Sequence, residues 1–179
     1  MPLSSNRIKY LRSLHHKKYR DLENRYLLEG VRLLEEALAS PVIIHEIITS
    51  AVEPSPRLQG LLQTARDRAI AIHEVSAATL ASLCDTDAPQ GIVALAEKSA
   101  VTAPRWSGLH EPTLLILDQL HDPGNLGTIL RTAEWFGVQT VLLSRHTVEL
   151  YNPKVVRSAM GALFRLRCQI GRASCRERV

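Results

Sequence analysis

Residues 117–137 of this 179-residue chain read Leu117-Asp-Gln-Leu-His-Asp-Pro-Gly-Asn-Leu-Gly-Thr-Ile-Leu-Arg-Thr-Ala-Glu-Trp-Phe-Gly137, and they are the most informative segment for its fold. The apolar run Thr113-Leu-Leu-Ile-Leu117 that leads into it is typical of a strand buried on both faces of a parallel sheet. Asp122-Pro-Gly-Asn125 interrupts the run, because Pro fixes φ, Gly permits positive φ and Asn can accept hydrogen bonds from free helix N–H groups. A helix is then expected from about Leu126 to Phe136, with Gly137 as its cap.

Two polar residues in this stretch are candidates for a functional site. Asn125 lies in the loop, and Arg131 lies within about two turns of the expected helix start. Both are therefore near the carboxyl ends of the strands, where open α/β sheets bind ligands. Each also has an ordinary structural alternative. Arg131 can be a solvated surface group paired with Glu134, and Asn125 can be only a helix cap.

The same stretch resembles the first signature motif of the SpoU (TrmH-like) RNA 2′-O-ribose methyltransferases of the SPOUT superfamily. That motif reads roughly D-x-x-x-D-P-x-N-x-G-x-x-x-R-T-A-x-x-F-G. The matching residues are Asp118, Asp122, Pro123, Asn125, Gly127, Arg131, Thr132, Ala133, Phe136 and Gly137. The resemblance implies methyl transfer from S-adenosylmethionine to a ribose 2′-hydroxyl of ribosomal or transfer RNA, with Asn125 and Arg131 as catalytic residues. Because an arginine stays protonated, Arg131 is expected to stabilise the forming alkoxide and position the adjacent phosphate, not to act as the base.

Residues 21–98 are expected to form a small α/β/α domain. Strand patterns at 25–28, 42–49, 70–75 and 91–96 alternate with helical patterns at 31–38, 57–68 and 76–83. Leu28-Glu29-Gly30 and Pro89-Gln90-Gly91-Ile92 resemble the family's N-terminal substrate-binding domain, whose fold is like that of an RNA-binding ribosomal protein. We therefore expect an α/β protein with a basic arm and substrate-binding domain at 1–98, a linker at 99–112 and a partial SPOUT-type domain at 113–168.

Basic residues gather at the two ends of the sequence. Residues 1–32 carry eight Lys or Arg against three Asp or Glu, and residues 154–179 carry seven against one. The first group is interleaved with aromatic rings, so we expect its cations to meet RNA phosphates and its rings to stack on unpaired bases. The alternative is a solvated helical face. The expected RNA-binding residues are Arg7, Lys9, Arg12, Lys17, Lys18 and Arg20.

The remaining composition narrows the class of protein. Three cysteines without framework spacing favour a reduced intracellular protein. No Cys/His cluster has metal-ligand spacing, and no apolar run predicts a membrane span or signal peptide. We therefore expect a cytoplasmic protein without a metal. A dinucleotide-dependent enzyme is disfavoured because the loop lacks G-x-G-x-x-G, whereas a non-catalytic RNA-binding module remains the alternative function.

The end of the chain departs from the family. Val138 to Ser144 is expected to be a second parallel strand, and Asn152-Pro153 is expected to open a helix. Family members continue with a Gly/Glu-rich loop and a Pro- and Ser-Leu-Asn-containing helix start, which form the trefoil knot that holds S-adenosylmethionine and much of the dimer interface. Neither motif is present, so we expect a C-terminally truncated, inactive chain without cofactor-binding residues, and the homodimer is doubtful. Residues 169–179 resemble a non-native tail; the alternative is a natural basic tail.

Overall fold

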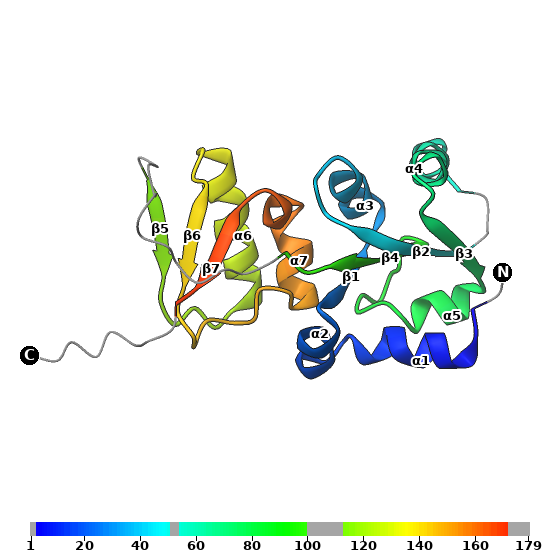
Figure 1. Cartoon of the computed structure of the whole chain (residues 1–179), viewed down its shortest axis with the longest axis horizontal. Coiled ribbons are helices and arrows are strands. Elements are labelled where there is room, and N and C mark those ends of the chain that lie inside the picture. The colour runs from blue at the N-terminus through cyan, green and yellow to red at the C-terminus, as the bar shows by residue number, and fades with distance from the viewer. Residues whose placement is uncertain (1–2, 51–53, 100–112, 172–179) are drawn as a thin grey trace, which may run out of the picture. The chain divides into compact units, whose positions relative to one another are not determined.

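The computed structural model describes residues 3–50, 54–99 and 113–171, and the chain divides into two compact units, Met1–Lys98 and Ser99–Val179 (Figure 1). Each unit has its own sheet and its own buried apolar residues. Within the described residues, no helix is both long and apolar enough to cross a membrane.

The first unit is built on a four-stranded sheet in the order β1-β4-β2-β3. The strands are Arg25–Glu29 (β1), Ile92–Glu97 (β4), Ile44–Ser50 (β2) and Ala71–Val75 (β3). β4 is antiparallel to β1 and β2, whereas β3 is parallel to β2. β4 lies inside the sheet because it is apolar on both faces, and its residues 92–96 are all buried.

Helices cover both faces of this sheet, which confirms the α/β/α layering predicted from the sequence (Figure 1). α3 (Val31–Leu38) and α4 (Pro56–Asp67) pack together on one face. α1 (Ser5–Ser13) and α5 (Ala77–Ala81) lie on the other face. The core beneath α1 and α5 is a cluster of aliphatic side chains from both helices and the sheet: Leu11, Leu14, Ile48, Leu80, Leu83, Val93 and Leu95.

The basic start of the chain is part of this folded unit and not a separate arm. It forms α1 and α2 (Lys17–Glu23), and the side chains of Leu11 and Leu14 are almost fully buried in the core. The sequence pattern did not predict that these helices pack on the sheet, because their few apolar residues are separated by many charged ones. The expectation of an arm is therefore corrected to a pair of packed helices.

The second unit contains three parallel strands in the order β5-β6-β7: Leu114–Leu117, Thr140–Leu143 and Arg167–Ile170. α6 (Pro123–Trp135) connects β5 to β6. α7 (Pro153–Ala159) and a 3₁₀ turn, Ala162–Phe164, lie between β6 and β7. Strands alternating with helices in a parallel sheet confirm the α/β class predicted for this half of the chain.

β7 corrects the expected start of the tail. Gln169 and Ile170 pair with β6, and the Gly171 N–H donates to the Leu143 carbonyl oxygen at 2.8 Å. The sequence Arg167-Cys-Gln-Ile170 has no clear strand pattern, because the strand is defined by its pairing with β6 and not by its own composition. The rest of the expected tail, residues 172–179, lies outside the described residues.

α6 and α7 are in close contact at Gly127. A Cβ at this position would collide with the Ser158 hydroxyl oxygen and would lie 2.7 Å from Ser158 Cβ and 2.8 Å from the Ala159 backbone nitrogen. The Ser158 hydroxyl itself donates to the Lys154 carbonyl oxygen at 2.7 Å, so it is held in place. The glycine of the motif is therefore required for helix packing.

We expect Gly127→Ala to destabilise the second unit by about 1–3 kcal/mol, because the added methyl overpacks a contact with backbone. Gly60→Ala on α4 is the matched control, since nothing lies within 4 Å of a Cβ at Gly60. That change should stabilise its helix by roughly 0.5–1 kcal/mol. Urea unfolding measures both effects, and a Gly127→Ala protein as stable as the wild type would contradict the packing role.

Candidate active site

The first turn of α6 is fixed by Asp122. This residue is in extended conformation at the N-cap, and its Oδ1 accepts the backbone N–H of Asn125 at 2.6 Å. Pro123 occupies the first turn, where its missing N–H costs nothing. The helix therefore begins three residues before the predicted Leu126, and the alternative in which Asn125 caps it is wrong: Asn125 lies inside the first turn with an exposed side chain.

α6 has one buried face and one exposed face. Leu126, Gly127, Leu130 and Ala133 are buried, as the helical spacing of the sequence predicts. The exposed face carries Asn125, Thr128, Arg131, Thr132 and Trp135. The hydroxyls of Thr128 and Thr132 are already used, because each donates at 2.9 Å to the carbonyl oxygen four residues earlier. Asn125 and Arg131 are thus polar groups of this face whose side chains have no partner among the described residues.

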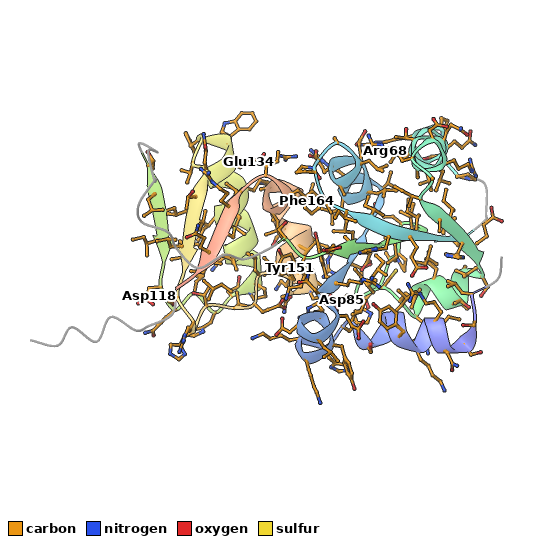
Figure 2. All side chains as sticks on the ribbon, in the orientation of Figure 1. Arg68, Asp85, Asp118, Glu134, Tyr151 and Phe164 are labelled. Carbon is orange, nitrogen blue, oxygen red and sulfur yellow. The ribbon has the colours of Figure 1, made fainter. Side chains whose placement is uncertain are left out.

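The surface ion pair considered for Arg131 is not formed. Glu134, labelled in Figure 2, pairs with Arg165, which follows the 3₁₀ turn. The second Arg165 contact, from Nη2 to Glu134 Oε2, is 3.3 Å. Because both carboxylate oxygens of Glu134 bind Arg165, the guanidinium of Arg131 stays directed to solvent. An exposed cation on the helix of the motif is suited to binding an anionic substrate.

The two short motifs of the first unit meet in space. The side-chain oxygen Oε1 of Gln90 accepts the Val31 N–H at the start of α3 at 3.1 Å, and the Gly30 N–H donates to the Ile92 carbonyl oxygen at 3.2 Å. Gly30 has φ +107°, and a Cβ there would lie 2.9 Å from Gln90 Oε1. Segments about sixty residues apart are therefore joined, and Gln90 supplies the cap that α3 lacks at its own N-cap residue.

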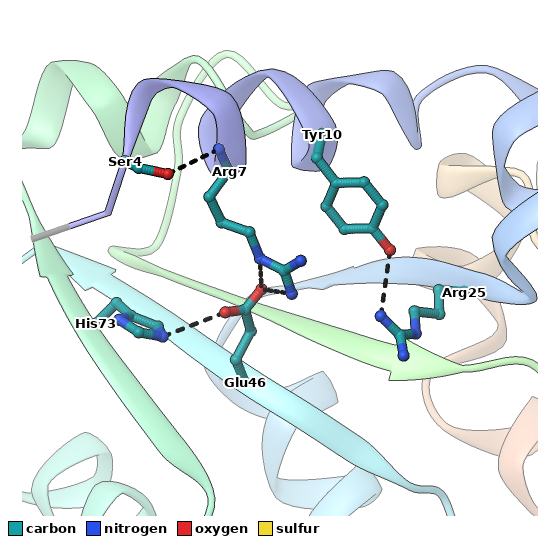
Figure 3. A network of polar contacts seen from close by, with 6 residues as sticks. All are labelled: Ser4, Arg7, Tyr10, Arg25, Glu46 and His73. Atoms are coloured by element: carbon teal, nitrogen blue, oxygen red, sulfur yellow. Dashed lines mark hydrogen bonds and ion pairs between the residues drawn. The ribbon is translucent and has the colours of Figure 1, made fainter. Parts of the chain in front are cut away.

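The expected RNA-binding residue Arg7 has a structural partner (Figure 3). Its guanidinium lies 2.7 Å from the carboxylate of Glu46 on β2, and it stacks over the Tyr10 ring at 4.6 Å. Glu46 is only 6% exposed and also contacts His73 Nε2 at 3.2 Å. A buried carboxylate needs such partners. Arg7 therefore holds α1 on the sheet, a role that the sequence did not reveal.

Arg20 is corrected from an RNA contact to a structural residue. It is 3% exposed, and its Nη1 donates to the carbonyl oxygens of Leu14 and His15, each at 2.8 Å. These carbonyls follow the end of α1, where helix carbonyls lack intrahelical partners. The cation thus closes the turn between α1 and α2 and is not available to a phosphate.

The other four basic residues remain candidates for an RNA interface. Lys9, Arg12, Lys17 and Lys18 are exposed on α1 and α2, and Tyr19 beside them is 39% exposed. Arg12 Nε donates to the Ser82 hydroxyl at 3.1 Å, which leaves its other nitrogens free to turn outward. Four exposed cations with an exposed ring form the kind of surface that contacts RNA phosphates and unpaired bases.

A cavity of about 310 Å³ lies in the second unit beside β7. It is lined by Ser99, Leu150, Tyr151, Leu163, Phe164, Arg165, Leu166, Arg167, Cys168 and Gln169. Burial raises the pKa of the Tyr151 hydroxyl and of the Cys168 thiol to about 12 each, so both stay protonated at neutral pH. None of the lining residues belongs to the motif at 117–137, so this cavity is separate from the exposed face of α6.

Comparison with known proteins gives two family matches. Residues 5–94 match the MRM3-like substrate binding domain, and residues 112–175 match the SpoU rRNA Methylase family. The chain is 34% identical over 165 residues to the 23S rRNA (guanosine(2553)-2′-O)-methyltransferase RlmP of Bacillus subtilis (strain 168), covering 90% of this chain and 60% of RlmP. It is 39% identical over 170 residues to the mitochondrial rRNA methyltransferase 3A of Danio rerio, covering 92% of this chain and 38% of that protein.

Two solved structures share the fold. An RNA 2′-O ribose methyltransferase superposes with a TM-score of 0.79 at 32% identity, over 96% of this chain and 64% of that one. An AdoMet-bound rRNA methyltransferase from Sinorhizobium meliloti superposes with a TM-score of 0.76 at 27% identity, over 96% and 63%. The chain thus spans less than two thirds of the length of each of these relatives.

Proposed function

We propose a function from the premise that this chain belongs to the SpoU rRNA methylase family and carries an MRM3-like substrate-binding domain. The proposed activity is transfer of a methyl group from S-adenosylmethionine to a ribose 2′-hydroxyl of ribosomal RNA. RlmP and the mitochondrial relatives are named for rRNA, which favours ribosomal over transfer RNA. Because the relatives include bacterial and mitochondrial proteins, the cytoplasmic location stays a prediction.

One observation carries the proposal: the fold uses several residues of the motif but leaves the polar side chains of Asn125 and Arg131 unused. Asp122 and Pro123 start α6, Gly127 permits its contact with α7, and Ala133 is buried. Asn125 and Arg131 remain exposed on α6 without a partner among the described residues. Polar residues that a motif requires and the fold does not use are best explained by contact with a substrate.

The chemistry that these two residues supply is positioning and charge stabilisation. A ribose hydroxyl is a poor nucleophile until it loses its proton, so negative charge develops on its oxygen during attack. Arg131 is permanently charged and stabilises that oxygen and the adjacent phosphate. Asn125 holds the nucleotide in line for the transfer. S-adenosylmethionine supplies the methyl group, and we assign no residue of this chain to holding it.

The first unit supplies the binding of RNA in this account. We expect residues 1–98 alone to bind a fragment of 23S ribosomal RNA, with an affinity that falls steeply as salt rises, because phosphate contacts release counterions. Lys17→Gln together with Lys18→Gln should reduce the slope of log affinity against log salt by about 1.4–1.8. Filter binding measures both quantities.

The control for this binding experiment is Arg66→Gln. Arg66 is also exposed, but it lies on α4, across the sheet from α1. The Arg66→Gln change should leave the salt dependence of RNA binding unchanged. An isolated first unit that is folded by circular dichroism and has no RNA affinity at low salt would contradict the assignment of this unit as the RNA-binding part.

A further inference from the structure

A second cation, Lys154, lies beside the start of α6, which also carries Arg131. α6 and α7 pack so that Gly124 meets Lys154 and Gly127 meets Ser158. α6 connects β5 to β6 and α7 connects β6 to β7, and these three strands are parallel, so the two helices run in the same direction and begin at the same end of the sheet. Lys154, in the first turn of α7, is consequently next to the first turn of α6, which carries Asn125.

The Lys154 side chain extends over α6 with its charge exposed. Its Cε lies 3.6 Å from the position that a Cβ on Gly124 would take. Lys154 is exposed and forms no hydrogen bond or ion pair through Nζ among the described residues. The carboxylate nearest along the loop, Asp122, uses its Oδ1 to cap Asn125 at 2.6 Å. The ammonium group is therefore available to a ligand.

Local stability does not explain a lysine at this position. The first turn of a helix is its positive end, where an added cation is unfavourable. α7 is started by Asn152, whose side chain accepts the Lys154 N–H at 2.9 Å, and by Pro153, so it needs nothing from the lysine side chain. The Asp122 carboxylate lies near the lysine stem at Gly124, but no ion pair joins the two side chains within the described residues, so the ammonium group is open to an external partner.

Lys154 and Arg131 lie along the same side of α6. Gly124 and Arg131 are seven residues apart, which places them on one stripe of the helix about 10 Å apart along its axis. Each ribose in an RNA strand is flanked by two phosphates, one on its 5′ and one on its 3′ side. We infer that Lys154 is a positioning residue that binds one of these phosphates while Arg131 acts at the ribose oxygen and the other. This inference rests on the proposed function.

The test uses the whole 179-residue chain and an RNA fragment that contains position 2553 of 23S ribosomal RNA, the nucleotide in the name of RlmP. Affinity is measured by fluorescence anisotropy over a series of potassium chloride concentrations. Lys154→Gln should weaken binding and reduce the slope of log affinity against log salt by about 0.7–0.9, the loss of one phosphate contact. Lys154→Arg should keep the wild-type slope, and Arg66→Gln should not change it.

The outcomes separate this inference from the proposed function. A slope unchanged by Lys154→Gln, in a wild-type chain that binds the RNA, overturns the role of Lys154 alone. An equal loss of slope with Arg66→Gln also overturns the role of Lys154, because the effect would then come from the overall charge of the chain and not from one phosphate contact. A wild-type chain that does not bind the RNA overturns the proposed function together with this inference. Because Lys154 is exposed and a cation in the first turn of a helix is unfavourable, the thermal midpoint of Lys154→Gln should be no lower than that of the wild type.

Discussion

Replacing Arg131 by alanine is expected to lower turnover about 10²–10³-fold, the usual cost of removing one group that stabilises a developing oxyanion. The measurement requires an extended chain, in which residues 1–171 are followed by the downstream segments of RlmP that carry the two further motifs of the family. RNA affinity should fall by no more than the loss of one phosphate contact, far less than turnover, because most phosphate contacts lie on α1 and α2. A loss in kcat without a loss in binding identifies a transition-state role.

Arg165→Ala is the matched control for Arg131→Ala. Arg165 is also an exposed arginine of the second unit, but its charge is paired with Glu134. Removing an exposed ion pair costs little, typically about 0–1 kcal/mol of stability, so turnover should stay within a few-fold of the wild type. Equal losses of turnover and RNA binding in Arg131→Ala would argue against the assigned role.

The 179-residue chain by itself is expected to bind S-adenosylmethionine negligibly and to be inactive. In this family the resemblance places the cofactor pocket in motifs beyond Leu166 that this sequence does not contain. The described sheet agrees with that view. β5 is composed only of Leu and Ile, as expected of a strand covered on both faces, yet it lies at a sheet edge with Ile116 65% exposed.

Calorimetric titration of the purified chain tests this expectation, with the extended chain as the positive control. The extended chain should bind the cofactor with measurable heat, and the 179-residue chain should give none above dilution. Saturable binding by the shorter chain in the micromolar range would show that residues 1–179 already form a cofactor site.

Periodicity predicted the elements whose pattern is complete within a short window. α3 spans the expected residues, and β1, β3, β4 and β5 lie within a residue of their expected bounds. β4 and β5 contain an unbroken apolar run and α3 has a regular helical spacing, so local composition alone identifies them.

The elements and roles that the sequence did not predict depend on distant partners. β7 exists because β6 offers a paired edge, and Glu46 is buried because Arg7 and His73 reach it from α1 and β3. The start of α6 was ambiguous for a different reason. Asp122 and Asn125 are both good caps three residues apart, and only the observed hydrogen bond distinguishes them. Arg20 was assigned to RNA because its sequence neighbours are exposed cations.

The proposed function requires this chain to carry the RNA-binding unit and the reacting helix of a ribose methyltransferase. The most direct test is to incubate the extended chain with 23S ribosomal RNA and S-adenosylmethionine and then to hydrolyse the RNA with alkali. Alkaline cleavage requires a free 2′-hydroxyl, so the account predicts one new position that resists cleavage, present with the wild type and absent with Arg131→Ala. Methyl incorporation without any alkali-resistant position would mean that a base is methylated, and it would contradict the account.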